Sequence, residues 1–216
     1  MTDNSRFISF EGIDFSGKTT QIELLTQQLE QKGEKVLIMR EPGGTKISER
    51  IRDILLDKNH NEMTDLCEVF LYSAARNQLL NEKIVDDLEA GNFVIADRFV
   101  DSTTAYQGFG RRIPMDLIRD INRAATGDLL PGLTFILDID PDQILDRKKQ
   151  RNMEIDRLES AGKDFYDRVH KGYHKIAELD PIRVKLIDAT KSIDQIKTDI
   201  WEFVTQKMNS NQIKEM

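Results

Sequence analysis

One short stretch of the chain contains the residues of a phosphate-binding loop. Gly12, Gly17, Lys18 and Thr19 follow the pattern Gly-x-x-x-x-Gly-Lys-Thr, which is typical of a P-loop. The glycines allow a tight turn that brings successive N–H groups close to an anion, and a helix that begins here adds the positive end of its dipole. The alternative is a glycine-rich turn that binds nothing. The motif lies between a strand pattern and a helix pattern, and this position disfavours the alternative. The stretch therefore predicts a nucleotide phosphate site.

The residue types within this loop predict their roles. Lys18 would reach the β- and γ-phosphates of a nucleotide, and the Thr19 hydroxyl would contact Mg²⁺. Asp14 would point its carboxylate at a sugar hydroxyl or at the metal. The residues expected to bind ATP are Gly12, Ile13, Asp14, Phe15, Ser16, Gly17, Lys18, Thr19 and Thr20.

Two carboxylates at the ends of apolar runs are further candidates for the Mg²⁺ site. Asp97 closes the third apolar run, where P-loop enzymes place an aspartate that holds the metal directly or through water. The alternative for Asp97 is an ion pair with Arg98 or Arg40. Glu11 ends the first apolar run and is the second acidic candidate. Together with Thr19, these two carboxylates form the predicted metal site.

The composition limits the class of protein. With 216 residues, 39% of them hydrophobic and 32% charged, the chain suits one soluble globular domain over residues 1–216. No apolar run reaches the roughly 18–20 residues of a membrane span, so we expect no membrane partner. Cys67 is the one cysteine, which excludes an intramolecular disulfide and favours a reducing cytoplasm. The net charge of −7 argues against broad nucleic-acid binding.

Short apolar runs alternate with helical patterns along the chain. Between the runs, apolar residues recur with helical spacing, as at Ile22, Leu25 and Leu29. Short apolar strands separated by helices indicate a parallel sheet that is covered on both faces. We therefore predict an α/β fold with a doubly wound, five-stranded parallel sheet, whose ligands lie beyond the carboxyl ends of the strands. The predicted strands are 7–10, 36–39, 93–96, 133–137 and 184–187.

Polar residues follow the predicted strands at the edge where ligands are expected. Arg40 comes directly after the second strand and Arg98 comes just after the third, which puts two cations near the expected phosphates. The alternative is that surface loops are polar in any case. We accept this alternative for Asp138–Pro141, because aspartate followed by proline is common where a helix begins.

A long helical pattern over residues 63–89 interrupts the alternation. Tyr72 and Arg76 stand four residues apart, so they share one helix face and could stack on and hydrogen-bond a base. The alternative is that Phe70, Leu71 and Leu79 belong to the core and that Arg76 is solvated. These residues taken alone favour the alternative.

A second interruption, over residues 147–168, is dense in cations. An arginine-rich flap between two helices fits a lid, roughly 147–163, that closes over a transferring phosphoryl group. The alternative is a solvated charge run, which such a stretch would favour if it stood alone. The basic residues are Arg147, Lys148, Lys149, Arg151, Arg157, Lys163 and Arg168.

His170 and His174 stand four residues apart on the helix that is predicted after this lid. The spacing is that of a metal-binding pair, but the glutamate that follows the first histidine in zinc proteases is missing. We therefore favour a structural role for both histidines.

A P-loop, an arginine-rich lid and a site with an aromatic ring and an arginine together predict phosphoryl transfer from ATP to a small acceptor. Such a transfer needs cations on the phosphate oxygens and exclusion of water, and it needs no protein nucleophile. Several motifs resemble those of thymidylate kinases in order and spacing, from about Phe7 to Met208. These motifs are Phe10–Asp14, Arg40–Thr45, Asp97–Ser102, Ala105–Gly108 and Asp156–Glu159.

The resemblance implies the P-loop kinase fold and transfer of the γ-phosphoryl group of ATP to dTMP, with Mg²⁺ as cofactor. It also implies a homodimer, since relatives are usually homodimers. For the thymine base, it implies that Tyr72 stacks on the ring and that Arg76 hydrogen-bonds O4. Thr103 and Gln107 would bind the other edge of the base.

The resemblance also assigns the sugar and the acceptor phosphate. Tyr106 would pack beside C2′ and disfavour a ribose hydroxyl, and Asp14 would contact the 3′-OH or metal-bound water. Arg98 would hold the acceptor phosphate with Arg40 and Glu41 close by, and Arg52 would line the same pocket. The residues implied for dTMP binding are Glu41, Arg52, Tyr72, Arg76, Arg98, Thr103, Tyr106 and Gln107.

Members of the family supply a catalytic arginine either from the P-loop or from the lid. Phe15 and Ser16 stand where a P-loop arginine could have been, so the lid must provide it, with Arg151 and Arg157 as the candidates and Arg147 as the third. The predicted catalytic residues are therefore Lys18, Arg98, Arg151, Arg157 and Asp14.

Two other functions remain as alternatives. A kinase for another nucleotide or nucleoside would use the same phosphate machinery. A P-loop NTPase switch without an acceptor is the second, although the chain lacks the Asn-Lys-x-Asp segment with which GTPases read guanine.

Overall fold

The computed structural model describes residues 4–144 and 162–212, and its centre is one parallel sheet. The strand order is β2-β3-β1-β4-β5, the doubly wound arrangement that the sequence predicts. Each predicted strand is confirmed and continues for one more residue, which is charged, at its carboxyl end. The strands are β1 (Phe7–Glu11), β2 (Val36–Arg40), β3 (Phe93–Asp97), β4 (Leu133–Asp138) and β5 (Val184–Asp188).

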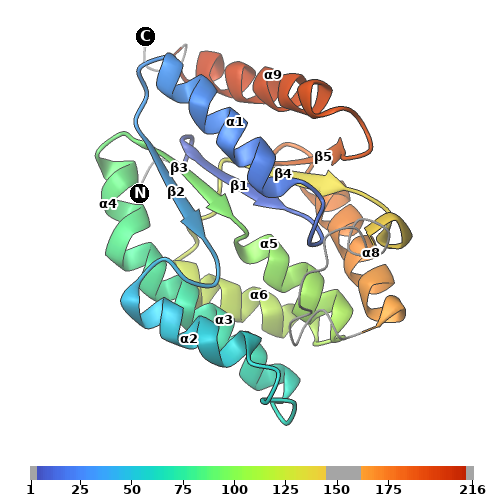
Figure 1. The fold of residues 1–216 in the computed structure, drawn as a ribbon. Coiled ribbons are helices and arrows are strands. Elements are labelled where there is room, and N and C mark those ends of the chain that lie inside the picture. Colours follow the sequence, from blue (N-terminus) through green and yellow to red (C-terminus); the bar gives the residue numbers. More distant parts are fainter. Residues whose placement is uncertain (1–3, 145–161, 213–216) are drawn as a thin grey trace.

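Helices cover both faces of this sheet. Figure 1 shows α1 and α9 on one side of the strands, with α4, α5 and α8 on the other. None of the helices in the described part of the chain combines the length and the apolar character needed to cross a membrane. The helical segments are α1 (Lys18–Gln31), α2 (Lys46–Leu56), α3 (Asp65–Leu79), the π-helical η1 (Leu80–Ile84), α4 (Val85–Glu89), α5 (Val100–Thr103), the π-helical η2 (Thr104–Gly110), α6 (Met115–Thr126), α8 (Lys163–Leu179) and α9 (Ile193–Gln212).

Alternate residues of β1 pack into two different hydrophobic clusters. Ile8 belongs to a buried cluster with Leu25 of α1 and Ile200 of α9. Its neighbour Phe7 belongs to a second cluster with Leu79 of α3. Because side chains alternate along a strand and both faces are covered, the central strands are apolar almost throughout.

The helical pattern over residues 63–89 is confirmed, because α3, η1 and α4 follow one another directly. Two expectations about its side chains are wrong: Phe70 is 53% exposed, whereas Arg76 is only 1% exposed. A buried guanidinium is stable where acceptors satisfy its N–H groups, and Arg76 donates to Glu41 and Thr103. The helical segments α5, η2 and α6 are not predicted by the sequence analysis.

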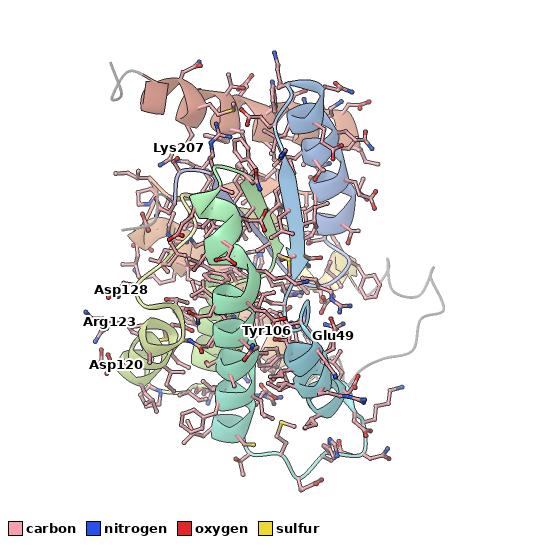
Figure 2. All side chains as sticks on the ribbon, turned by 90° about the vertical axis from the view of Figure 1, so that its left-hand side faces the viewer. Glu49, Tyr106, Asp120, Arg123, Asp128 and Lys207 are labelled. Carbon is pink, nitrogen blue, oxygen red and sulfur yellow. The ribbon has the colours of Figure 1, made fainter. Side chains whose placement is uncertain are left out.

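Local signals fix the carboxyl end of α6. Gly127 ends the helix in a left-handed conformation (φ 58°), which glycine adopts most easily. Arg123 in the last turn donates to Asp128 at 3.0 Å. Figure 2 shows this exposed pair at one edge of the molecule, well apart from Glu49 of α2.

Candidate active site

The P-loop joins β1 to α1 and forms a cradle of donors. Gly12 (φ 126°) and Gly17 (φ 105°) both have positive φ, and a Cβ on Gly12 would lie 2.7 Å from the Leu137 carbonyl oxygen. The N–H groups of the first turn of α1 have no intrahelical partner, as in any α-helix, and no side chain of the described residues caps them. The buried Ser16 hydroxyl likewise has no partner among the described residues. These donors suit a bound phosphate.

Lys18 lies against this loop and is buried, although it is a cation. Its Nζ donates to the carbonyl oxygens of Gly12 (3.2 Å) and Ile13 (3.3 Å) and lies 4.0 Å from the Asp14 carboxylate. Burial and the neighbouring Arg98 lower the pKa of Lys18, whereas nearby carboxylates oppose that shift. The ammonium group is therefore held where a β- or γ-phosphate would meet it.

Arg98 lies between the P-loop and α8. Its Nη2 donates to Asp14 Oδ1 at 2.5 Å, and its Nη1 donates to the Gly12 carbonyl oxygen at 2.9 Å. The backbone of Arg98 is left-handed (φ 74°), a strained conformation that often marks functional sites. The next N–H group, from Phe99, donates to Glu11 Oε1 at 2.7 Å and so fixes this turn.

Glu11 is the fully buried acid behind Arg98. Its second oxygen accepts hydrogen bonds from Ser102 Oγ (2.5 Å) and Tyr173 Oη (3.2 Å). Burial and the negative charge of Asp101 raise the pKa of Glu11 to about 7, while the Ser102 hydrogen bond and Arg98 oppose the shift. Both oxygens of Glu11 are thus engaged by the protein, and this residue positions the Arg98 turn.

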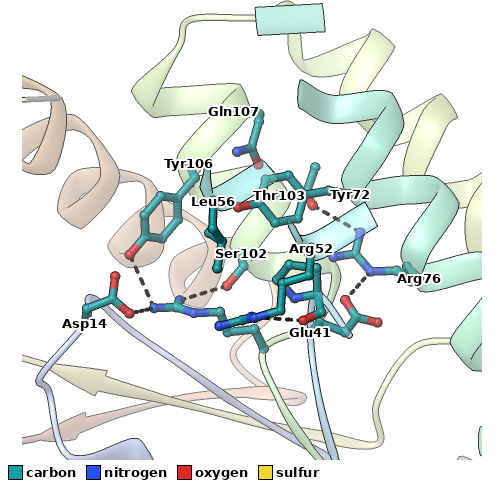
Figure 3. A pocket seen from close by; sticks show the side chains of 12 residues that line it. Asp14, Glu41, Arg52, Leu56, Tyr72, Arg76, Ser102, Thr103, Tyr106 and Gln107 are labelled. Carbon is teal, nitrogen blue, oxygen red and sulfur yellow. Dashed lines mark hydrogen bonds and ion pairs between the residues drawn. The ribbon is translucent and has the colours of Figure 1, made fainter. Parts of the chain in front are cut away.

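A pocket beside Arg98 is lined by every residue that the resemblance implies for the acceptor (Figure 3). In Figure 3, Asp14 lies at the P-loop end of this pocket and Arg76 at the α3 end, with Thr103 and Tyr72 between them. The complete lining is Asp14, Glu41, Pro42, Arg52, Leu56, Tyr72, Arg76, Arg98, Ser102, Thr103, Tyr106 and Gln107.

Known proteins match the chain along most of its length. The family model for thymidylate kinase matches residues 10–200. The chain belongs to the thymidylate kinase family. A thymidylate kinase of Geobacillus sp. (strain WCH70) is 47% identical over 192 residues, which are 88% of this chain and 91% of that protein. One from Chlorobaculum parvum is 45% identical over 201 residues, which are 89% of this chain and 92% of that protein.

The fold of this family is also found in solved structures. The crystal structure of thymidylate kinase from Ehrlichia chaffeensis is similar with a TM-score of 0.75 and 33% sequence identity. The match covers 92% of this chain and 97% of that chain. The predicted family and the predicted P-loop kinase fold are therefore confirmed, and the chain is a phosphotransferase of the thymidylate kinase family.

In this member of the thymidylate kinase family, Arg76 and Glu41 form a buried ion pair at the pocket wall. Arg76 Nε donates to Glu41 Oε2 at 2.7 Å, and the two side chains are 1% and 4% exposed. Arg76 Nη1 also donates to Thr103 Oγ1 (3.0 Å), and Nη2 donates to the Phe99 carbonyl oxygen (3.0 Å). Burial raises the pKa of Glu41 to about 7 although Arg76 opposes the shift.

Glu68 fixes the orientation of the Gln107 amide. Gln107 Nε2 donates to Glu68 Oε1 at 2.8 Å, and Arg111 Nη2 donates to Glu68 Oε2 at 3.1 Å. Because a carboxylate accepts and does not donate, the amide NH₂ group must face Glu68, which turns the amide oxygen of Gln107 away from it. Gln107 therefore offers an acceptor to the pocket.

Tyr106 is held between Arg98 and α8. The Arg98 guanidinium lies 5.2 Å from the centre of the Tyr106 ring, and Arg98 Nη2 donates to the Tyr106 hydroxyl at 3.5 Å. Phe165 and Tyr173 meet the same ring edge to face, with ring centres 6.1 and 6.3 Å away. This packing leaves the Tyr106 ring little freedom to move.

The predicted metal residues differ in how exposed they are. Thr19 is exposed in the first turn of α1, Asp97 is half-buried at the end of β3, and Glu11 is buried. Arg98 pairs with Asp14, and Arg40 pairs with Glu49 at 2.8 Å, so the described residues do not form the ion pairs considered for Asp97. Arg40 does not line the acceptor pocket.

Some residues of the site were missed by the sequence analysis, and others lie outside the described residues. Tyr173 of α8 and Glu68 of α3 contact Glu11 and Gln107, but no motif or spacing marks either residue. The lid candidates Arg151 and Arg157 lie outside the described residues, as does most of the predicted lid.

Proposed function

We propose that this chain transfers the γ-phosphoryl group of ATP to dTMP, giving dTDP and ADP. The position of Arg98 supports this best, because it joins the P-loop carbonyl of Gly12 to the pocket that contains the implied acceptor residues. A donor phosphate on the P-loop and an acceptor phosphate at Arg98 would face each other, as an in-line transfer requires. The similarity to proteins named thymidylate kinase supports dTMP as the acceptor.

In this proposal, the cations of the site neutralise the phosphate oxygens. Lys18 binds the donor phosphates, and Arg98 binds the acceptor phosphate with Arg52 on the same pocket wall. Arg98 now donates to the Asp14 carboxylate, so an incoming phosphate would replace that partner. Asp14 would then be able to accept a hydrogen bond from the sugar 3′-OH.

The base would be recognised by hydrogen bonds that depend on the protein network behind the pocket. Gln107 presents its amide oxygen, which suits the N3–H group of thymine and does not suit cytosine, because cytosine has no N3–H group. Arg76 would donate to O4 with a remaining Nη2–H group, and the Thr103 hydroxyl, which accepts from Arg76, keeps its own hydrogen to donate. Tyr72 would stack on the ring, and Tyr106 would leave no room for a 2′-hydroxyl.

The residues fit Mg²⁺ as a cofactor. A hydroxyl from Thr19 and carboxylates from Asp97 and Glu11 are hard oxygen ligands, the type that Mg²⁺ prefers. Thr19 and Asp97 would hold the ion, and Glu11 would act behind them, since its oxygens already accept protein hydrogen bonds. Bound Mg²⁺ would neutralise charge on the donor phosphates.

Further parts of the proposal concern the chain as a whole. We propose a single domain with a lid over residues 147–163, in which Arg151 or Arg157 supplies the catalytic cation. We also propose a cytoplasmic protein that binds no nucleic acid and no membrane.

We further propose a homodimer. Exposed apolar side chains on neighbouring helices support an interface between two copies. They are Ile47, Ile54, Leu66, Phe70, Met115 and Leu117. Light scattering after size exclusion would measure the mass, and a monomer at micromolar concentration would contradict this part.

A coupled assay of ADP release tests the reaction. Enzyme, ATP and Mg²⁺ are combined with dTMP, dUMP, dCMP or AMP in turn, with Lys18→Ala as the inactive control. We expect rapid ADP release with dTMP, slow or no release with the others, and none in the control. Preference for another monophosphate would support the alternative kinase, and release without any acceptor would support the NTPase switch.

A further inference from the structure

A histidine and carboxylate cluster lies on the surface between β4 and α8. His170 Nε2 and His174 Nε2 lie 2.8 and 2.9 Å from the same oxygen, Asp138 Oδ1. The two imidazole rings are 4.6 Å apart, and the three ligand atoms lie within 4.8 Å of one another. From the sequence we expect Asp138 to belong to a helix start and the histidines to be structural, and no sequence pattern links the three residues.

The donor atoms of this cluster are those that borderline transition metals prefer. Two histidines at i and i+4 on a helix present their nitrogens on one face, the spacing that zinc enzymes use for two ligands. Asp138 adds an oxygen from the end of a neighbouring strand. Two histidines and one carboxylate are a known ligand set for Zn²⁺, which leaves a fourth position for water.

The surroundings of the cluster favour positive charge and allow entry. The carboxylates of Asp140 and Asp167 are negative charges near His170. Asp188 of β5 is the strand neighbour of Asp138 and adds a further carboxylate nearby. The side chains of Asp138, His170 and His174 are 27%, 26% and 45% exposed, so an ion can reach them from solvent.

The cluster is distinct from the candidate active site. Tyr173, between the two histidines in the sequence, donates to Glu11, whereas both histidines contact Asp138 at the end of β4. Neither Asp138 nor the two histidines line the acceptor pocket. The Mg²⁺ site of the proposed reaction contains oxygen ligands, whereas this cluster contains two nitrogens, which Mg²⁺ disfavours.

We propose that Asp138, His170 and His174 form a binding site for a divalent transition metal, with Zn²⁺ as the best fit. Each imidazole that now directs an Nε2–H group at Asp138 would bind the metal through the Nε2 lone pair. Its hydrogen would move to Nδ1 by exchange with water, and Asp138 would remain ionised. Metal binding would thus replace two hydrogen bonds by three metal–ligand bonds.

Titration of the untagged protein with Co²⁺ and Zn²⁺ tests this proposal. The exposed Cys67 is replaced by serine throughout, because a free thiol binds the same metals. Co²⁺ gives visible absorption bands whose intensity reports the coordination number, and a chromophoric chelator measures Zn²⁺ affinity by competition. Millimolar Mg²⁺ is present in all samples.

His60 provides a matched control, because the chain has three histidines and His60 lies outside the cluster. We expect one equivalent of Zn²⁺ to bind. His170→Ala and His174→Ala should each weaken Zn²⁺ binding by more than about tenfold. Even the mutation of residues that only hydrogen-bond a zinc ligand typically costs about this much affinity. His60→Ala should leave the affinity unchanged.

Two results would overturn the proposal. One is the absence of saturable Zn²⁺ or Co²⁺ binding in the parent protein. The other is binding that persists equally in the His170→Ala/His174→Ala variant, whose fold is checked by circular dichroism. His174→Gln provides a second variant that retains a polar side chain, and it too should lose affinity. None of these measurements depends on kinase activity, so failure here leaves the proposed function untouched.

Discussion

The buried pair of Arg76 and Glu41 leads to a prediction about stability and pH. The perturbation is Arg76→Met, which keeps a long apolar stem and removes the guanidinium. Removing one partner of a buried ion pair typically costs about 3–5 kcal/mol where the remaining group is charged, so the full cost is expected at high pH, where Glu41 is ionised. The bonds from Arg76 to Thr103 and to the Phe99 carbonyl oxygen are also lost, and this part of the cost does not depend on pH.

The pH-dependent part comes from Glu41. Its pKa is about 7 in the folded protein against a reference value of 4.5, so the folded state holds the proton more tightly. The contribution of Glu41 to stability is therefore fully present below about pH 4.5 and is lost as the pH rises to about 7, by about 3 kcal/mol in total. Without Arg76, which lowers this pKa, the loss should continue above pH 7.

Urea unfolding at about pH 6 and about pH 8.5 measures the difference. Wild type and Arg76→Met should differ by a nearly constant amount up to about pH 7. Above that, the gap should widen by up to about 1.4 kcal/mol per pH unit, because only the variant still binds the proton. The raised pKa of Glu11 is present in both proteins and cancels in the comparison.

The double variant Glu41→Gln/Arg76→Met is the control. It lacks the titrating carboxyl group, so its difference from wild type should not widen above about pH 7. An equal loss at both pH values in the single variant would refute the reasoning, because it would mean that Glu41 does not hold an extra proton in the fold.

Three further changes test other parts of the site. Arg98→Lys keeps the positive charge but loses the planar guanidinium group. The kcat/KM for dTMP should therefore fall by about 100-fold or more in steady-state assays, with little change in the KM for ATP. An unchanged kcat/KM for dTMP would contradict the role of Arg98 in phosphate binding. Glu68→Gln frees the Gln107 amide to turn over, and the KM for dTMP should rise by about tenfold, worth about 1.4 kcal/mol; an unchanged KM would show that the amide is oriented by other contacts. Arg183→Met leaves Asp101 buried without its two-bond partner, so urea unfolding should show a loss of about 3–5 kcal/mol; a loss below about 1 kcal/mol would contradict this role.

The sheet could be predicted because its signals are local. The five apolar runs are short and lie between helical patterns, and the three central ones are buried almost throughout, so hydrophobicity alone marks them. The P-loop could be predicted for a related reason: Gly12 and Gly17 occupy conformations that few other residues tolerate.

The parts that could not be predicted depend on partners distant in the sequence. Helical spacing alone favours a solvated Arg76, because a lone arginine usually lies in solvent, and only the fold brings Glu41, 35 residues away, to its side. The role of Glu68 depends on Gln107, 39 residues away. Asp138 reaches its histidines only because α8 packs beside β4. In each case the pairing is made by tertiary packing, which no local pattern encodes.

Competition between four acceptors tests whether dTMP is the preferred substrate. ATP and Mg²⁺ are mixed with equal concentrations of dTMP, dUMP, dCMP and dGMP, and the nucleoside diphosphates are separated by chromatography over time. The proposed function predicts that dTDP forms first and in excess, together with an equal amount of ADP, and that neither forms with Lys18→Ala. Formation of another diphosphate ahead of dTDP, or of ADP and phosphate without any new diphosphate, would contradict it.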